Sequence, residues 1–281
     1  MRISCPVSME EALGELRENP ETVPLAGGTD LLVAINFGRL RPESVMSLHR
    51  LEELRDVSQE STVRCGARAT YTRMLADLSD VVMRQVCRSV GSPQIRNAGT
   101  LGGNLGTCSP AGDTLAALAA LDAMVVVRSL DEERRVPLAD FMRGPKQPGL
   151  RPGELVVAAE WQQAGRSQAF LKAGTRNAMV IAVANCALVV DPARQRVGLG
   201  LGSVGPVVLR APEAERFAAG LLDERDWSLP LRLPETATAE FGRLAAGATR
   251  PIDDVRGTAA YRRHVVAVMA GRALERACAS A

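Results

Sequence analysis

The sequence contains two glycine pairs: Ala26-Gly27-Gly28-Thr29-Asp30 and, further on, Arg96-Asn97-Ala98-Gly99-Thr100-Leu101-Gly102-Gly103-Asn104. A Gly-Gly step lets successive backbone N–H groups turn toward one point, because neither residue carries a Cβ that blocks positive φ or close approach. Each pair therefore predicts a backbone nest that binds an anion. Two nests in one domain indicate a ligand with a pyrophosphate, and a dinucleotide is the commonest ligand of that kind.

The residues around the glycine pairs extend the two predicted sites. The apolar segment 31 to 35 follows the first pair, and we expect it to form a short helix whose first amides add to the anion site. The second pair continues as Thr-x-Gly-Gly-Asn-x4-Ser-Pro-x2-Asp, within a stretch that we expect to be a long, irregular and functional loop. Its Thr100, Asn104 and Ser109 can hydrogen-bond a ligand. Asp113 can accept from a ribose hydroxyl or cap the next helix, and the two roles are compatible.

Composition limits the class of protein. With 281 residues, 46% hydrophobic content and a mean hydropathy of zero, the chain can bury one large domain or two ordinary ones. The formal net charge is +2 and no basic block is present, so nucleic acid is not expected as a partner. The longest apolar stretch, 178 to 190, is interrupted by Asn185 and is too short for a membrane span. No signal peptide is visible, and we expect a cytoplasmic protein.

Cysteine, histidine and lysine are sparse. The six cysteines form no Cys-x-x-Cys pair and the chain has two histidines, so we expect no metal site and no Ser/His/Asp or Cys/His nucleophile. The cysteines are expected to be buried thiols in a reducing compartment. Lys146, in a Pro- and Gly-rich loop, is expected to be exposed and without a role, and Lys172 is the other lysine.

The hydrophobic pattern divides the chain into two parts. Ser8 and Glu11 form a capping-box pattern for a first helix, after which short strands and helices follow one another. Later, apolar strands at 180 to 190, 197 to 201 and 207 to 210 precede three helical segments near 213 to 222, 235 to 247 and 258 to 278. This order predicts an α+β chain with domains at 1–165 and 166–281, the first split again near residue 58.

One further glycine motif is rejected as a nucleotide site. Gly200-x-Gly202-x-x-Gly205 has the spacing of the Rossmann fingerprint, but Pro206-Val207-Val208 follows it where a helix should begin. We expect a strand and a turn there instead.

Taken together, the motifs resemble those of the FAD-binding subunit of the molybdenum hydroxylases. This family includes the medium subunits of bacterial xanthine dehydrogenases, aerobic carbon monoxide dehydrogenases and related aldehyde and N-heterocycle oxidoreductases. The resemblance is carried by the first glycine segment, the run from Ser92 to Asn104 and the Ser-Pro-x-x-Asp that follows, and it extends to Phe170-Leu171-Lys172 and Tyr261-Arg262-Arg263. It implies a vanillyl-alcohol-oxidase/PCMH-type FAD-binding domain followed by a smaller α+β C-terminal domain.

The resemblance implies FAD as the cofactor and assigns residues to it. The first segment would wrap the pyrophosphate with Leu25, Ala26, Gly27, Gly28, Thr29, Asp30 and Leu31. The second would supply the opposite wall with Thr100, Leu101, Gly102, Gly103 and Asn104, and Ser109 would lie nearby. Asp113 would hold the adenosine side. Lys172 would lie near the flavin ring, where a cation stabilises the reduced anionic form, and its alternative is a solvated surface position.

The function implied by the resemblance is electron transfer within a complex. A molybdopterin-binding large subunit would oxidise the substrate, and a small subunit with [2Fe–2S] clusters would deliver electrons to the FAD of this chain. A terminal acceptor, such as NAD or oxygen, would then be reduced, and no catalytic acid or base is required of this chain. Two alternatives stay open, a free-standing flavin oxidoreductase of the same superfamily and an FAD-free scaffold subunit.

Overall fold

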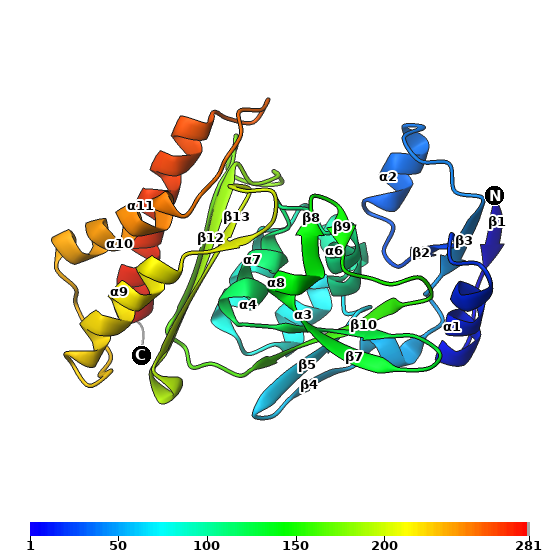
Figure 1. Cartoon of the computed structure of the whole chain (residues 1–281), viewed down its shortest axis with the longest axis horizontal. Coiled ribbons are helices and arrows are strands. Elements are labelled where there is room, and N and C mark those ends of the chain that lie inside the picture. The colour runs from blue at the N-terminus through cyan, green and yellow to red at the C-terminus, as the bar shows by residue number, and fades with distance from the viewer. Residues whose placement is uncertain (280–281) are drawn as a thin grey trace.

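The computed structural model describes residues 1–279 and shows the predicted α+β architecture, with sheets that succeed one another across the molecule (Figure 1). The first sheet is parallel, in the order β1-β3-β2. Its elements are β1 (Arg2–Ser4), α1 (Met9–Glu18), β2 (Val23–Leu25), α2 (Leu31–Asn36) and β3 (Ser44–Ser47). The predicted cap of α1 is confirmed, because Ser8 Oγ accepts a hydrogen bond from the Glu11 amide at 3.2 Å.

The central sheet is antiparallel, in the order β4-β5-β10-β6-β7. Its strands are β4 (Val57–Gln59), β5 (Thr62–Gly66), β6 (Met124–Arg128), β7 (Glu133–Pro137) and β10 (Leu155–Gln162). One face packs on the first sheet through α1, and the other packs on short helices. These are α3 (Tyr71–Asp77), α4 (Val81–Ser89), α6 (Leu101–Thr107), α7 (Asp113–Ala120) and α8 (Leu138–Phe141), with a small hairpin of β8 (Met142–Gly144) and β9 (Gln147–Pro148). The short helix η1 (Glu52–Arg55) packs with α1 on the first face, and α5 (Pro93–Ala98) contacts α3.

The stretch with the second glycine pair is helical, so the prediction of a long irregular loop was wrong. Ser92 Oγ accepts from the Ile95 amide at the start of α5, and Thr100 Oγ1 accepts from the Gly103 amide at 3.0 Å at the start of α6. These caps satisfy amides that a helix leaves free at its first turn. They offset the low helix propensity of the glycines.

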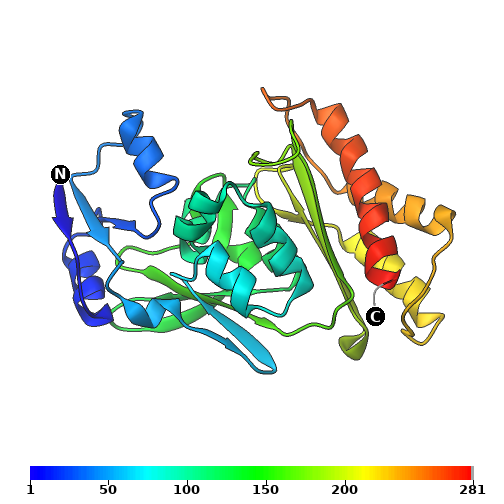
Figure 2. The same cartoon turned by 180° about the vertical axis from the view of Figure 1, so that it is seen from behind.

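The C-terminal sheet is antiparallel, in the order β11-β12-β13-β14. Its elements are β11 (Gln168–Ala173), β12 (Ala184–Asp191), η2 (Pro192–Arg194), β13 (Arg196–Gly202) and β14 (Leu209–Arg210). The three predicted helices are α9 (Pro212–Asp223), α10 (Glu235–Gly247) and α11 (Ala259–Ala279), and they cover the outer face (Figure 2). The strand expected from residue 180 begins at Ala184, after a loop. Among residues 1–279 no helix is both long and apolar enough to cross a membrane.

The inner face of this sheet meets α7 at backbone contact distance. A Cβ at Gly200 would lie 1.9 Å from the Ala116 carbonyl oxygen, and one at Gly198 would lie 2.0 Å from that of Ala120. Only glycine therefore allows β13 to approach the alanine-rich helix this closely. The glycines of the rejected fingerprint thus lie in a strand and the turn after it, as expected, and serve packing.

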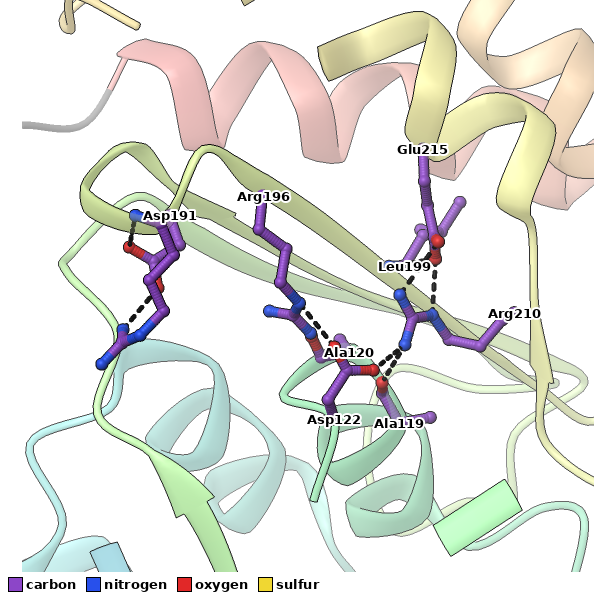
Figure 3. A network of polar contacts seen from close by, with 9 residues as sticks. Ala119, Ala120, Asp122, Asp191, Arg196, Leu199, Arg210 and Glu215 are labelled. Carbon is purple, nitrogen blue, oxygen red and sulfur yellow. Dashed lines mark hydrogen bonds and ion pairs between the residues drawn. The ribbon is translucent and has the colours of Figure 1, made fainter. Parts of the chain in front are cut away.

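Two arginines of the C-terminal sheet hold the C-terminal end of α7 (Figure 3). Arg196 donates to the Ala120 carbonyl at 2.6 Å, and Arg210 donates to the Ala119 carbonyl at 3.0 Å. Both also pair with Asp122, and Glu215 of α9 pairs with Arg210. The arginines bond carbonyls of the last turn of the helix, and their charge is favourable beside the negative end of the helix dipole. The glycines therefore set how closely α7 approaches the sheet, and the arginines set how the helix is oriented on it.

This contact predicts the effect of Gly200→Ala. The new methyl group would overlap a backbone carbonyl that no rotamer change can move, so we expect the variant to lose about 3 kcal/mol or more of unfolding free energy in denaturant titrations. Gly220→Ala in α9 is the matched control, because a Cβ there meets nothing within 4 Å. Gly220→Ala should be neutral or stabilising by up to about 1 kcal/mol. Equal stability of the Gly200 variant and wild type would contradict the packing argument.

Candidate functional site

The two glycine segments line one cavity of about 390 Å³, which we call the glycine cavity. Its wall combines the end of β2 and the start of α2 with one face of α6 and the start of β10. The lining residues are Val23, Pro24, Leu25, Ala26, Gly27, Gly28, Thr29, Asp30, Leu31, Ala34, Leu48, Ala67, Tyr71, Thr100, Gly102, Gly103, Asn104, Gly106, Thr107, Lys146, Leu150, Leu155 and Val156. Segments far apart in the sequence thus line one cavity, and that both contact one ligand stays a prediction.

The first glycine segment has the free donors expected of a nest. Within residues 1–279, the amides of Gly27, Gly28, Thr29 and Asp30 have no hydrogen-bond acceptor. Gly28 has a positive φ of 69°, and a Cβ at Gly27 would lie 1.7 Å from the Ala98 carbonyl oxygen. Glycine is therefore required at both positions, and the loop is packed against the end of α5. Free amides on a fixed loop can bind an anion.

The second glycine segment is not a free nest, so that part of the prediction was wrong. The Leu101 amide donates to the Ala69 carbonyl at 3.0 Å, and the Gly102 amide donates to that of Ala67 at 2.8 Å. The Gly103 amide is taken by Thr100 Oγ1. Because these donors are already used inside the protein, they cannot also bind a phosphate. Leu101 is fully buried in the core and lines neither cavity described here.

The second segment contributes a helix face without bulky side chains. Gly103, Gly106 and Thr107 have the spacing of one face of α6, and all line the glycine cavity. A Cβ at Gly103 would meet only Thr100 Oγ1, at 3.0 Å, and one at Gly106 would meet nothing. Thr107 Oγ1 donates to Asp30 at 3.2 Å, which ties this face to the first segment. Backbone atoms of α6 are therefore open to a ligand.

A second, adjoining cavity of about 270 Å³ lies where the central helices meet β11 and the loop before β12, and we call it the junction cavity. It shares Thr29, Asp30, Tyr71 and Asn104 with the glycine cavity, so the two lie next to each other. Its other lining residues are Val90, Gly91, Ile95, Ser109, Ala111, Gly112, Asp113, Lys172, Met179, Val180 and Ile181. The predicted site residues outside the glycine cavity, apart from Leu101, are therefore found here.

Asp113, Lys172 and Asn185 form a buried polar cluster beside the junction cavity. Lys172 Nζ lies 2.5 Å from Asp113 Oδ2, and Asn185 Nδ2 donates to Asp113 Oδ1 at 2.7 Å. The side chains of Lys172 and Asp113 are only 11% and 6% exposed, so the ion pair is largely shielded from solvent. Burial raises the pKa of Asp113, and the Lys172 ammonium opposes that rise.

Two of the alternatives predicted for these residues are wrong. The sequence-based assignments of Asp113 to the adenosine side of FAD and of Lys172 to the flavin ring stay predictions, and the two side chains are in contact. Asp113 is the first residue of α7, where Gly112 is the cap and makes no side-chain bond, so its alternative role as the cap is not realised. Nor is Lys172 a solvated surface residue.

Sequence analysis missed several residues of the site. Gly106 and Thr107 could have been found from their spacing to Gly103, had the stretch been recognised as helical. Tyr71, which lines both cavities, carried no signal of its own. Lys146 was expected to have no role, and its side chain is exposed as predicted, yet it lines the glycine cavity. Its distance from both motifs in the sequence hid this placement.

Comparisons with known proteins agree with this geometry. Residues 1–160 match the family described as "FAD binding domain in molybdopterin dehydrogenase", and residues 169–277 match the "CO dehydrogenase flavoprotein C-terminal domain". The chain is 30% identical to the glyceraldehyde dehydrogenase medium chain of Sulfolobus acidocaldarius, covering 95% of each chain. It is 29% identical to the carbon monoxide dehydrogenase medium chain of Afipia carboxidovorans, covering 98% of this chain and 96% of that one. A solved chain of reconstituted CO dehydrogenase from Oligotropha carboxidovorans has a TM-score of 0.89 at 26% identity, covering 100% of this chain and 98% of that one.

The buried ion pair predicts a pH-dependent cost for Lys172→Met. Without the ammonium group, Asp113 stays buried and uncompensated, and we expect a loss of about 3–5 kcal/mol at neutral pH. Because burial raises the folded-state pKa of Asp113 above its unfolded value, this loss should grow as the pH rises from about 4 toward 7 and shrink when the carboxyl is protonated.

The double variant Lys172→Met with Asp113→Asn is the control for this experiment. It removes both charges, so it should be more stable than the single variant at neutral pH and should lack the added pH dependence. Denaturant titrations at several pH values measure both effects. A single variant with the same pH profile as the double variant would contradict the pairing.

Proposed function

The chain belongs to the FAD-binding medium subunits of the molybdopterin hydroxylase family, and from this premise we propose that it transfers electrons within a multi-subunit complex. It would receive electrons from the [2Fe–2S] clusters of a small subunit and pass them to a terminal acceptor such as NAD or oxygen. A molybdopterin-binding large subunit would oxidise the substrate. FAD, when bound, can exchange one or two electrons and so link carriers of both kinds.

The observation that carries this proposal is the row of free amides opposite the open face of α6. The amides at residues 27–30 can bind the diphosphate of FAD, and the face with Gly103 and Gly106 lets that group approach the helix backbone. Side chains at these positions would fill the space that the ligand needs. In this binding mode the first glycine segment supplies hydrogen-bond donors, and the second leaves space for the diphosphate beside α6.

We place the flavin end of FAD in the junction cavity and the adenosine end in the glycine cavity. Lys172 lines the junction cavity, where its charge can act on the ring, whereas apolar Leu48, Leu150 and Leu155 line the glycine cavity alone. The proposed contacts are Leu25, Ala26, Gly27, Gly28, Thr29, Asp30, Leu31, Thr100, Gly102, Gly103, Asn104, Ser109, Asp113 and Lys172. Asp113 then belongs to the flavin end, together with its partner.

We also propose that the chain divides near residue 165 into an FAD-binding domain and a C-terminal domain. The segment between β10 and β11, residues 163–167, separates the central sheet from the C-terminal sheet. A further division near residue 58 is supported by the change from the parallel sheet to the central sheet, whose first strand begins at Val57.

Gly103→Val tests the proposed binding mode. The branched side chain would project into the glycine cavity while meeting only Thr100 within the protein, so we expect loss of FAD with the fold retained. The flavin absorption of the purified chain and its thermal unfolding measure the two effects. Gly14→Val in α1 is the control, because a Cβ there meets nothing within 4 Å, and it should keep FAD. A folded Gly103→Val protein with wild-type FAD content would refute the binding mode.

The placement of the flavin end predicts opposite effects on its midpoint potential. Lys172→Met removes a cation and leaves Asp113 uncompensated, so the potential should fall. Asp113→Asn leaves Lys172 unpaired, so the potential should rise. A charged hydrogen bond contributes about 1–3 kcal/mol and 30 mV corresponds to about 1.4 kcal/mol, so each shift should be some tens of millivolts.

Spectroelectrochemical titration of the FAD-loaded chain measures these shifts. Arg166→Met is the control, because Arg166 is exposed in the turn before β11 and lines neither cavity. Its potential should equal that of wild type. Unchanged potentials in both test variants would move the flavin end out of the junction cavity.

A further inference from the structure

We propose that Lys146 binds the diphosphate of the dinucleotide and supplies the positive charge that the glycine segments lack. This inference rests on the proposed function, since it takes the glycine cavity as the place where FAD binds. It concerns affinity for the cofactor, whereas Lys172 is assigned to the potential of the flavin.

The backbone holds Lys146 at the wall of the glycine cavity. Lys146 lies in the turn between β8 and β9 and has a positive φ of 57°, which is uncommon for a residue with a side chain. Its amide donates to the Cys108 carbonyl at 3.0 Å, so the turn is tied to the residue that ends α6. Cys108 Sγ also contacts the Gly144 carbonyl at 3.8 Å. These contacts fix the turn, and with it the backbone of Lys146, at the wall of the cavity.

The same end of α6 also carries the contact to the first glycine segment. Thr107, next to Cys108, donates to Asp30 at 3.2 Å. The turn with Lys146, the end of α6 and the loop of free amides are thus joined by consecutive hydrogen bonds. Lys146 therefore shares one wall with the groups that we expect to bind the diphosphate.

The charges along the glycine cavity favour an anion contact for Lys146. Among residues 1–279, Asp30 and Lys146 are the only charged residues that line it, and Asp30 carries the last of the free amides. A diphosphate is negatively charged on both phosphates, so Asp30 opposes its binding and Lys146 favours it. Within residues 1–279, Lys146 forms no ion pair, unlike Lys172, which is held by Asp113. Its ammonium group is therefore available to the ligand.

Lys146→Met tests the inference when its binding of FAD is compared with its binding of riboflavin, across salt concentrations, and with the binding by Lys146→Arg. The full-length chain, freed of flavin, is titrated with FAD and with riboflavin, which has no phosphate, at several salt concentrations. We expect Lys146→Met to weaken FAD binding by about ten- to hundredfold, the effect of one charged hydrogen bond, and to reduce its salt dependence. Riboflavin binding should not change, and Lys146→Arg should restore most of the affinity for FAD.

Arg143→Met is the matched control. Arg143 lies in β8 of the same hairpin, is exposed and basic, and does not line the cavity, so its variant should bind FAD like wild type. An equal loss in the Arg143 variant would show a general charge effect and overturn the inference. So would an equal loss of riboflavin affinity, which would indicate a damaged hairpin.

The proposed function and the assignment of Lys146 can be refuted separately. If wild type binds no FAD, the proposed function fails and the inference fails with it. If wild type binds FAD and Lys146→Met binds it equally well at low salt, only the assignment of Lys146 is overturned. FAD binding measured by flavin fluorescence distinguishes these results without any activity assay.

Discussion

The close contact between α7 and β13 is the constraint on which the rest of the structure depends. Carbonyl groups of the helix lie directly on the strand, because Gly198 and Gly200 have no side chains. Arg196 and Arg210 then fix one end of the helix, and Lys172 and Asn185 bond Asp113 at the other (Figure 3 shows the first end). Both ends of one short helix are thus attached to the C-terminal sheet, which sets where that sheet lies relative to the central one.

The junction cavity is a consequence of this attachment. Lys172 comes from β11 and Asp113 from α7, so the ion pair forms only when the sheet and the helix are in contact. Burial makes an unpaired charge costly at this place, which ties the electrostatics of the site to the packing of the whole chain. A displacement of the C-terminal sheet would therefore alter both the shape of the cavity and the charge beside it.

The two similar glycine motifs contribute different groups to the glycine cavity. The first segment keeps its amides free and is closed by contact with α5, whereas the second uses its amides to begin α6 and attach that helix to the central sheet. Glycine allows close approach in both segments, of Gly27 to Ala98 and of Gly102 to Ala67, but only the first segment keeps its amides free. Two Gly-Gly pairs thus have different physical roles, because neighbouring elements accept hydrogen bonds from the amides of the second segment and not from those of the first.

The sequence by itself determined the motifs, the cap of α1, the three C-terminal helices and the membership of the family, since these depend on local spacing and residue type. The cap at Thr100 was not predicted, because the stretch around it was predicted as a loop. Only the tertiary structure decided that carbonyls of residues 67 and 69 take the amides of the second segment, that Asp113 contacts Lys172, and that Lys146 reaches the glycine cavity. Each of these contacts joins segments that are distant along the chain. Such contacts depend on packing and produce no periodic pattern in the sequence, so local spacing could not predict them.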